Sequence, residues 1–225
     1  MPLSDYTDPD LKNVSAMQAK HRPSIYLNIP FYRQHYDFSC GPACLMMAMK
    51  YLEPGVRPGK ELEIDLWREA NLVAVCGTSR YGLAFSAVIR GFSARVTSST
   101  GGPDFVEKFV PPLDDPAIKL LREQFSERRA RCKKLQIRER QSTITGKTLR
   151  EALFSNHVPL IVTSSRFCDG EDLPHWVVVT GIDDKFLYFS SPSDVRQKKR
   201  KAGLPGLSEV IGYHGDQSMV EIWNG

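Results

Sequence analysis

The sequence contains no run of apolar residues approaching the ~20 that a membrane-spanning helix requires. Its first residues are polar and acidic, and they lack the apolar core of a secretory signal peptide. No stretch is dominated by one or two residue types. From these absences we expect a soluble, cytoplasmic protein without a membrane span.

Cysteine is scarce, and charge is nearly balanced. The 5 cysteines are odd in number and too sparse for a secreted disulfide scaffold, which favours a reducing compartment. A net charge of only +4 argues against a dedicated nucleic-acid binder. The 41% of hydrophobic residues is typical of an ordinary globular protein with a packed core.

The chain is expected to form a short arm followed by one domain. Residues 1–23 show no clear hydrophobic periodicity and are interpreted as a loosely held N-terminal arm. Residues 24–225 are long enough to bury a complete core and are interpreted as a single domain, with a charged helical segment around 115–140. The basic residues at 128–134 and at 197–201 are interpreted as solvated, with binding of an acidic partner as the alternative.

Hydrophobic periodicity predicts helices in the first part of the domain and strands in the last part. Helices are expected over 43–52, 62–70, 81–91 and 118–134, and a further one from Thr148, which begins a capping-box pattern with Glu151. Strands are expected over 24–30, 92–96, 159–163, 175–182, 186–189 and 219–223, with a turn at 183–185 and loops over 98–112 and 197–201. Strands that follow helices, rather than alternate with them, indicate the α+β class.

The most informative stretch covers residues 34–44. Cys40 is followed by Gly41 and Pro42, and proline is favoured in the first turn of a helix because its missing N–H is not needed there. The residues after it form helices readily, so Cys40 is expected at a helix N-terminus. Unpaired amide N–H groups and the helix dipole favour a thiolate at that position. A base is available downstream in His175, which opens the most strand-like stretch of the chain.

Nucleophilic cysteine catalysis requires a thiol, a base within hydrogen-bond reach, and donors directed at the oxyanion of the tetrahedral intermediate. Cys40 and His175 are candidates for the first two roles. Gln34, on the loop that enters the helix, offers a side-chain N–H donor, and the backbone N–H of Cys40 offers a second. A glutamine shortly before the cysteine, with a histidine on a strand far downstream, is the arrangement of papain.

On these residues the sequence resembles the papain-like cysteine peptidases related to the double-glycine (bacteriocin-processing) leader peptidases, and most of all their stand-alone bacterial relatives. The resemblance covers Ile29–Met49, Leu66–Ala70, Tyr81–Leu83, Arg90–Phe92 and Pro159–Pro192. It implies Cys40 as the nucleophile, His175 as the general base and Gln34 as the oxyanion-hole residue. It also implies the papain-like fold, in which a helix carrying Cys40 packs on an antiparallel sheet carrying His175. No metal or organic cofactor is implied.

The chain departs from the family pattern at one position. The family places an aspartate directly before a proline after the histidine strand, where it orients the imidazole. Ser191 precedes Pro192 here, so a neutral hydroxyl takes the place of the carboxylate. Asp194 is a candidate substitute if the loop turns back, and Asp183 is a weaker one. Because the third residue mainly fixes the tautomer and orientation of the histidine, this departure weakens the site without removing its nucleophile.

Three functions stay open: cleavage of a peptide or isopeptide-type amide, transfer of the acyl group to an amine, and peptide binding without catalysis. The presence of Gln34, Cys40 and His175 favours the first two, whereas Ser191 favours the third. Cys40 has two further interpretations, a buried structural cysteine and a metal ligand together with Cys44 and His175. The expected partner is a peptide or protein substrate, and no oligomeric state is predicted.

Overall fold

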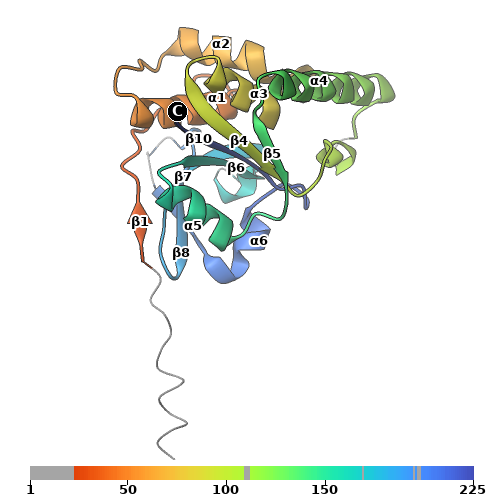
Figure 1. The fold of residues 1–225 in the computed structure, drawn as a ribbon. Coiled ribbons are helices and arrows are strands. Elements are labelled where there is room, and N and C mark those ends of the chain that lie inside the picture. The colour runs from red at the N-terminus through yellow and green to blue at the C-terminus, as the bar shows by residue number, and fades with distance from the viewer. Residues whose placement is uncertain (1–22, 109–111, 169, 195, 197–198) are drawn as a thin grey trace, which may run out of the picture.

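The computed structural model describes residues 23–108, 112–168, 170–194, 196 and 199–225 (Figure 1). The arm expected over 1–23 lies outside these ranges, apart from Pro23. The α-helices are α1 (Cys40–Leu52), α2 (Lys60–Ala70), α3 (Arg80–Val88), α4 (Asp115–Lys134), α5 (Gly146–Phe154) and α6 (Leu207–Val210). The strands are β1 (Ile25–Tyr26), β2 (Asn71–Leu72), β3 (Gly77–Thr78), β4 (Phe92–Ser98), β5 (Arg138–Gln141), β6 (Val158–Ser164), β7 (Pro174–Ile182), β8 (Phe186–Ser190), β9 (Lys199–Gly203) and β10 (Ser218–Asn224). The 3₁₀ helices are η2 (Val73–Val75), η3 (Asp104–Lys108), η4 (Ser165–Phe167) and η5 (Leu204–Gly206).

One sheet forms the centre of the described chain. Its strand order is β5-β4-β10-β6-β7-β8-β9, and β1 pairs with β7. The described neighbours are antiparallel except for β4 and β5, which run parallel. The short strands β2 and β3 form a separate antiparallel pair. A mostly antiparallel sheet with helices packed on it confirms the expected α+β class.

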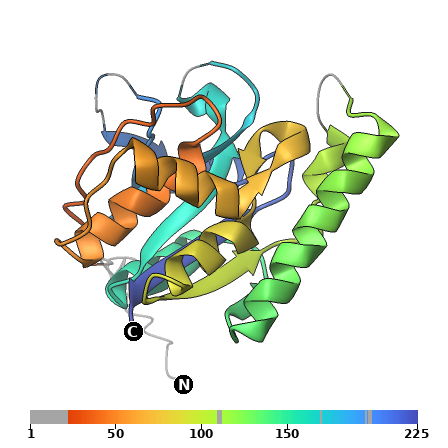
Figure 2. The same cartoon turned by 90° about the horizontal axis from the view of Figure 1, so that it is seen from above.

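Helices cover both faces of the sheet. α1 to α4 lie on one side in Figure 1, and α5 and α6 lie on the other. Seen from above in Figure 2, α1, α2 and α3 lie over the sheet, and α4 runs along its edge. α1 is buried almost all round because it lies between the sheet and the helices α2 and α3. The thiol of Cys44 donates to the carbonyl of Trp176 at 3.3 Å, which joins α1 to β7. The expected packing of the Cys40 helix on the His175 strand is therefore confirmed.

The charged segment forms α4 and then a strand that periodicity does not indicate. Leu121 and Phe125 of the expected apolar stripe are buried, whereas Leu120 is exposed. Arg128 is also buried, and its guanidinium donates to the side chain of Asn71 at 2.9 Å, so the interpretation of a solvated basic face is wrong at this residue. The strand β5 that follows is wholly exposed and polar, and it pairs with β4 at the edge of the sheet.

The start of α5 and two of the predicted loops also differ from the sequence-based expectation. Thr145 caps α5: its hydroxyl accepts from the N–H of Thr148 at 3.2 Å, so the predicted capping box of Thr148 with Glu151 is wrong. The predicted loop at 98–112 contains η3. The predicted loop at 197–201 overlaps β9, a lysine-rich edge strand paired with β8, while 197 and 198 lie outside the described residues.

The first strand is shorter than expected, and it packs closely against a glycine of β7. β1 covers two residues of the predicted 24–30. It approaches β7 so closely at Gly181 that a Cβ there would meet the carbonyl oxygen of Ile25 at 2.7 Å. Across the described ranges, no helix is both long and apolar enough to cross a bilayer. The cytoplasmic location stays a prediction.

Candidate active site

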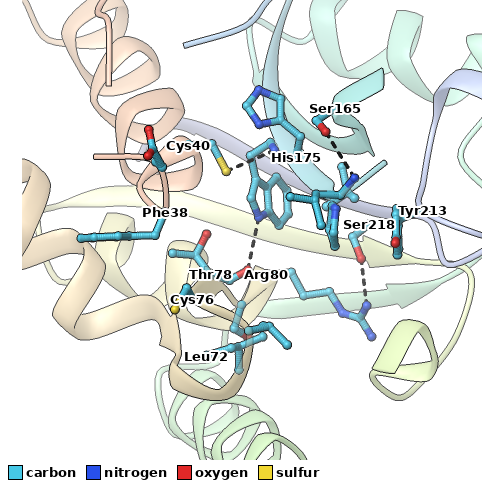
Figure 3. Close-up of a pocket in the computed structure, with 18 of the residues that line it drawn as sticks. Phe38, Cys40, Leu72, Cys76, Thr78, Arg80, Ser165, His175, Tyr213 and Ser218 are labelled. Carbon is cyan, nitrogen blue, oxygen red and sulfur yellow. Dashed lines mark hydrogen bonds between the residues drawn. The ribbon is translucent and has the colours of Figure 1, made fainter. Parts of the chain in front are cut away.

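Cys40 is the first residue of α1, as the sequence predicts, with Ser39 at the N-cap position. Its sulfur accepts a hydrogen bond from the backbone N–H of Trp176 at 3.5 Å. Because Trp176 directly follows His175 on β7, this contact brings together a cysteine and a histidine that lie far apart in the sequence. Figure 3 shows the two side chains next to each other in the same cavity.

The environment of the thiol has two opposing effects on its pKa. Burial disfavours the thiolate, while the N–H groups of Trp176, Gly41 and Cys40 itself favour it. Burial is the larger effect, and it raises the pKa of Cys40 from the ordinary 9.0 to about 11. The expectation of a thiolate favoured by the helix N-terminus is therefore wrong for this conformation, because desolvation outweighs the N–H donors.

His175 is buried on β7, and a hydroxyl holds its imidazole. The Nε2 atom lies 2.9 Å from Oγ of Ser191, and this oxygen lies 2.9 Å from Oγ of Ser193. Ser191 is fully buried, so solvent does not compete for this contact. The residue at the position of the family's aspartate thus does contact the histidine, but through a neutral oxygen.

Asp194, the alternative candidate for orienting His175, contacts Arg200 and the backbone of Arg196. Its Oδ2 atom forms an ion pair with Nη2 of Arg200 at 3.1 Å and also accepts from Nε of the same residue at 3.2 Å. Its Oδ1 atom accepts from the backbone N–H of Arg196 at 2.9 Å. Both carboxylate oxygens are thus engaged with this loop and β9. Asp183 lies in the turn after β7, where the hydroxyls of Tyr26 and Tyr188 donate to it.

Gln34 lines the cavity beside Cys40, but its amide faces its own loop. Nε2 donates to the backbone carbonyls of Tyr36 at 2.8 Å and Asp37 at 3.3 Å, and these bonds use both of its hydrogens. The buried Oε1 atom has no hydrogen-bond partner. The backbone N–H of Gln34 donates to the carbonyl of Pro192 at 3.0 Å, which ties the glutamine loop to the segment that carries Ser191.

A buried carboxylate that sequence analysis missed holds the same loop. Glu63 of α2 is fully buried and accepts from the backbone N–H of His35 at 2.8 Å and from the hydroxyl of Tyr32 at 2.9 Å. Its carboxylate also contacts the Ser39 hydroxyl and Nδ1 of His35. The signal in the sequence is that Glu63 shares the helical spacing of the buried residues Leu66 and Ala70.

The cavity that contains Cys40 and His175 has a volume of about 610 Å³. One wall is formed by the segment 72–80, which sequence analysis did not single out, and the other by residues of β6 and β7 and by Tyr213. The indole N–H of Trp176 donates to the carbonyl of Thr78 at 3.2 Å, so it joins the two walls. The apolar lining suits a peptide with its side chains. Its apolar residues include Phe38, Leu72, Val75, Phe125, Val162, Leu173, Pro174 and Trp176.

A buried ion pair of Arg80 with Asp216 lines the same cavity. In Figure 3 the guanidinium of Arg80 lies on the side of the cavity away from Cys40. The guanidinium of Arg80 lies 3.6 Å from Oδ1 of Asp216 and donates to the hydroxyl of Ser218 at 2.8 Å. It also lies 4.7 Å from the ring centroid of Phe125, a cation–π contact. Burial raises the pKa of Asp216, and the charge of Arg80 opposes that rise. The ion pair ties the start of α3 to the segment before β10, and the bond to Ser218 ties it to β10 itself.

The residues proposed as metal ligands have other contacts. Burial raises the pKa of Cys44 well above its ordinary value, and its thiol donates to the carbonyl of Trp176 at 3.3 Å. Within the described ranges, no group of three or more His, Cys, Asp or Glu side chains is placed to hold a metal ion.

The chain is similar to known peptidases. A family model described as "Peptidase_C39 like family" matches residues 29–205. A solved structure described as a C39-like peptidase from Bacillus anthracis is 13% identical, with 89% of this chain and 98% of that chain covered and a TM-score of 0.49. The peptidase domain of Streptococcus mutans ComA is 16% identical, with 84% of this chain and 97% of that chain covered and a TM-score of 0.35. No curated protein matches the chain.

Proposed function

The chain belongs to the Peptidase_C39 like family, and we propose that it is a cysteine peptidase or amidase that cleaves a peptide amide through a thioester on Cys40. The observation that supports this most directly is the bond from the N–H of Trp176 to the Cys40 sulfur. It places the thiol beside the residue that follows His175, at a cavity large enough for a peptide segment. Membership of the family suggests peptidase chemistry and nothing finer. The roles of individual residues are our proposal.

The hydrogen bonds around His175 fit a general base under one assignment of hydrogens. Nε2–H donates to Ser191, and the hydroxyl of Ser191 donates in turn to Ser193, so each group uses its single hydrogen. Nδ1 then carries a lone pair and takes the proton of the Cys40 thiol. Ser191 fixes the tautomer and the ring orientation, as a carboxylate does in related sites, but adds no charge to stabilise the imidazolium.

Acylation follows from these positions. The Cys40 sulfur attacks the carbonyl carbon of the peptide bond while His175 accepts the thiol proton. The C–N bond then breaks, and His175 returns the proton to the leaving amine. Water hydrolyses the thioester with His175 again as base, which regenerates the thiol. Because burial raises the pKa of the Cys40 thiol to about 11, we expect the thiol to lose its proton during the attack rather than before it.

Stabilisation of the oxyanion requires a rearrangement of one side chain. The backbone N–H of Cys40 is one donor, since it lies at the N-terminus of α1. Gln34 supplies the second donor when its amide turns from the carbonyls of Tyr36 and Asp37 towards the oxyanion. Such a turn is favoured because Oε1 accepts no hydrogen bond from the described protein in its present position.

The test is cleavage of a complex peptide mixture. Tryptic peptides blocked at their amines are incubated with the wild type, Cys40→Ala and His175→Ala, and new N-termini are counted by mass spectrometry. We expect new termini with the wild type, few with His175→Ala and none with Cys40→Ala. Equal counts for wild type and Cys40→Ala would refute catalysis through the thioester.

A second candidate is a peptide-binding module without turnover. Two observations favour it: Ser191 stands where the family has an aspartate, and the pKa of Cys40 is raised. The same peptide mixture distinguishes the candidates, because a binding module retains peptides on an immobilised column without generating new termini. Adding an amine acceptor to the mixture separates hydrolysis from acyl transfer.

A further inference from the structure

One buried carboxylate on a neighbouring helix holds the loop that carries Gln34. Glu63 of α2 is fully buried, and among the described residues no lysine or arginine pairs with it. The loop supplies its partners instead: the backbone N–H of His35 donates to Oε1 at 2.8 Å, and the hydroxyl of Tyr32 donates to Oε2 at 2.9 Å. The Ser39 hydroxyl contacts Oε1, and Nδ1 of His35 lies 3.0 Å from Oε2. Without such donors a buried carboxylate would be strongly destabilising.

The four contacts of Glu63 are satisfied together by one assignment of hydrogens. An ionised carboxylate only accepts, and its two oxygens take about four hydrogen bonds. The single hydrogen of the Tyr32 hydroxyl goes to Glu63, so Nδ1 of His35, 2.9 Å from the same hydroxyl, carries its own. Ser39 stands at the N-cap of α1, yet its side chain makes no cap bond and contacts the carboxylate instead. Donors from residues 32–39 thus saturate Glu63.

These donors lie on both sides of Gln34. Tyr32 precedes it by two residues, and His35 follows it directly. The backbone N–H of Gln34 donates to the carbonyl of Pro192 at 3.0 Å, so the backbone is fixed between Pro192 and Glu63. The side-chain amide, in contrast, is held by carbonyls of its own loop. Turning this amide towards the oxyanion therefore needs rotation about side-chain bonds and no movement of the loop.

We propose that Glu63 is a positioning residue of the reaction, whose carboxylate holds the loop so that the amide of Gln34 reaches the oxyanion. This inference rests on the proposed function. Glu63 does not line the described cavity, so it acts through the loop and not on the substrate. Because the oxyanion forms only as the reaction proceeds, a misplaced Gln34 should lower kcat and leave KM unchanged.

The test compares two carboxylate-to-amide variants on the same helix. Glu63→Gln replaces one acceptor oxygen by an NH₂ group that faces donors. Glu69→Gln is the matched control, because the oxygens of Glu69 accept from Arg90 at 2.7 and 2.9 Å rather than from the loop. The substrate is the peptide cleaved fastest in the mixture described above, resynthesised with a fluorophore and a quencher. Both constants are measured at a temperature at which circular dichroism shows every variant to be folded.

The decisive measurement is Glu63→Gln in the background of Gln34→Ala. We expect Gln34→Ala to lower kcat about 100-fold and Glu63→Gln about tenfold, with no change for Glu69→Gln. If Glu63 acts through Gln34, adding Glu63→Gln to Gln34→Ala changes kcat by less than about twofold, whereas an independent effect would lower it about tenfold further. Alkylation of Cys40 by iodoacetamide forms no oxyanion, so its rate should be the same in all variants.

Each other outcome has a defined meaning. An equal kcat for Glu63→Gln and the wild type would overturn the proposal. A further loss in the Gln34→Ala background, or a parallel loss of iodoacetamide alkylation, would also overturn it, because Glu63 would then support the whole site. If Glu63→Gln does not fold, Tyr32→Phe removes one donor from the carboxylate and replaces it in the same comparison, with a loss of about threefold expected. If iodoacetamide alkylates Cys40 but the wild type cleaves no peptide, the proposed function fails, and this inference falls with it.

Discussion

The reactivity of Cys40 in the resting protein is the sharpest prediction of the structure. The thiol pKa of about 11 compares with an ordinary value of 9.0. At pH 7 the thiolate fraction is therefore about 1 in 10,000, against about 1 in 100 for an ordinary thiol. We expect alkylation at pH 7 to be about 100-fold slower than for an unperturbed cysteine. The rate should rise about tenfold per pH unit up to about pH 11.

The assay is iodoacetamide alkylation from pH 6 to 11, read at each cysteine by mass spectrometry after digestion. Cys76 is exposed and serves as an internal reference for reagent activity in the same samples. The His175→Ala variant is expected to keep the steep dependence at high pH, because burial and backbone N–H groups determine the pKa of Cys40.

A plateau below pH 7 that disappears in His175→Ala would refute this reasoning. It would mean that a thiolate–imidazolium pair exists before substrate binds, and that the N–H groups at the start of α1 outweigh burial. The general-base mechanism proposed above would then be replaced by attack of a preformed thiolate.

Three further predictions concern the residues around the site. Ser191→Ala should lower turnover about tenfold by removing the partner of His175 Nε2, with Ser191→Asn restoring part of it in the same cleavage assay. Glu63→Gln places an N–H₂ group against donors and should lower the free energy of unfolding by about 1–3 kcal/mol in urea titrations, whereas the exposed Glu61→Gln should not change it. Gly41→Ala should cost about 1–3 kcal/mol in the same titrations because its Cβ would lie 2.1 Å from the Thr78 hydroxyl, while Gly101→Ala, whose nearest neighbour is at 3.7 Å, should be neutral. A stable Gly41→Ala variant would contradict the close approach of Thr78 to α1.

Local sequence determines the elements that carry the site. The run after Pro42 is rich in helix-forming residues and the run after His175 is rich in β-branched residues, so α1 and β7 follow from short-range preferences. A buried helix and a buried strand must also pack against apolar neighbours, which brings Cys40 towards His175. Two of the elements missed, β5 and β9, are polar edge strands whose pairing depends on a neighbouring strand rather than on their own pattern.

Tertiary structure determines which residue contacts His175 and how far burial shifts the pKa of Cys40. The sequence left open whether Ser191 or Asp194 orients His175; in the structure Ser191 lies 2.9 Å from Nε2 of His175, and Asp194 forms an ion pair with Arg200. The raised pKa of Cys40 comes from burial beneath distant segments, and it reverses the effect expected from the helix N-terminus alone. Glu63 and Thr78 gain their positions through contacts across the fold. Sequence alone thus determined the nucleophile and base candidates, because those depend on local pattern; the protonation state and the remaining contacts depend on desolvation and long-range packing.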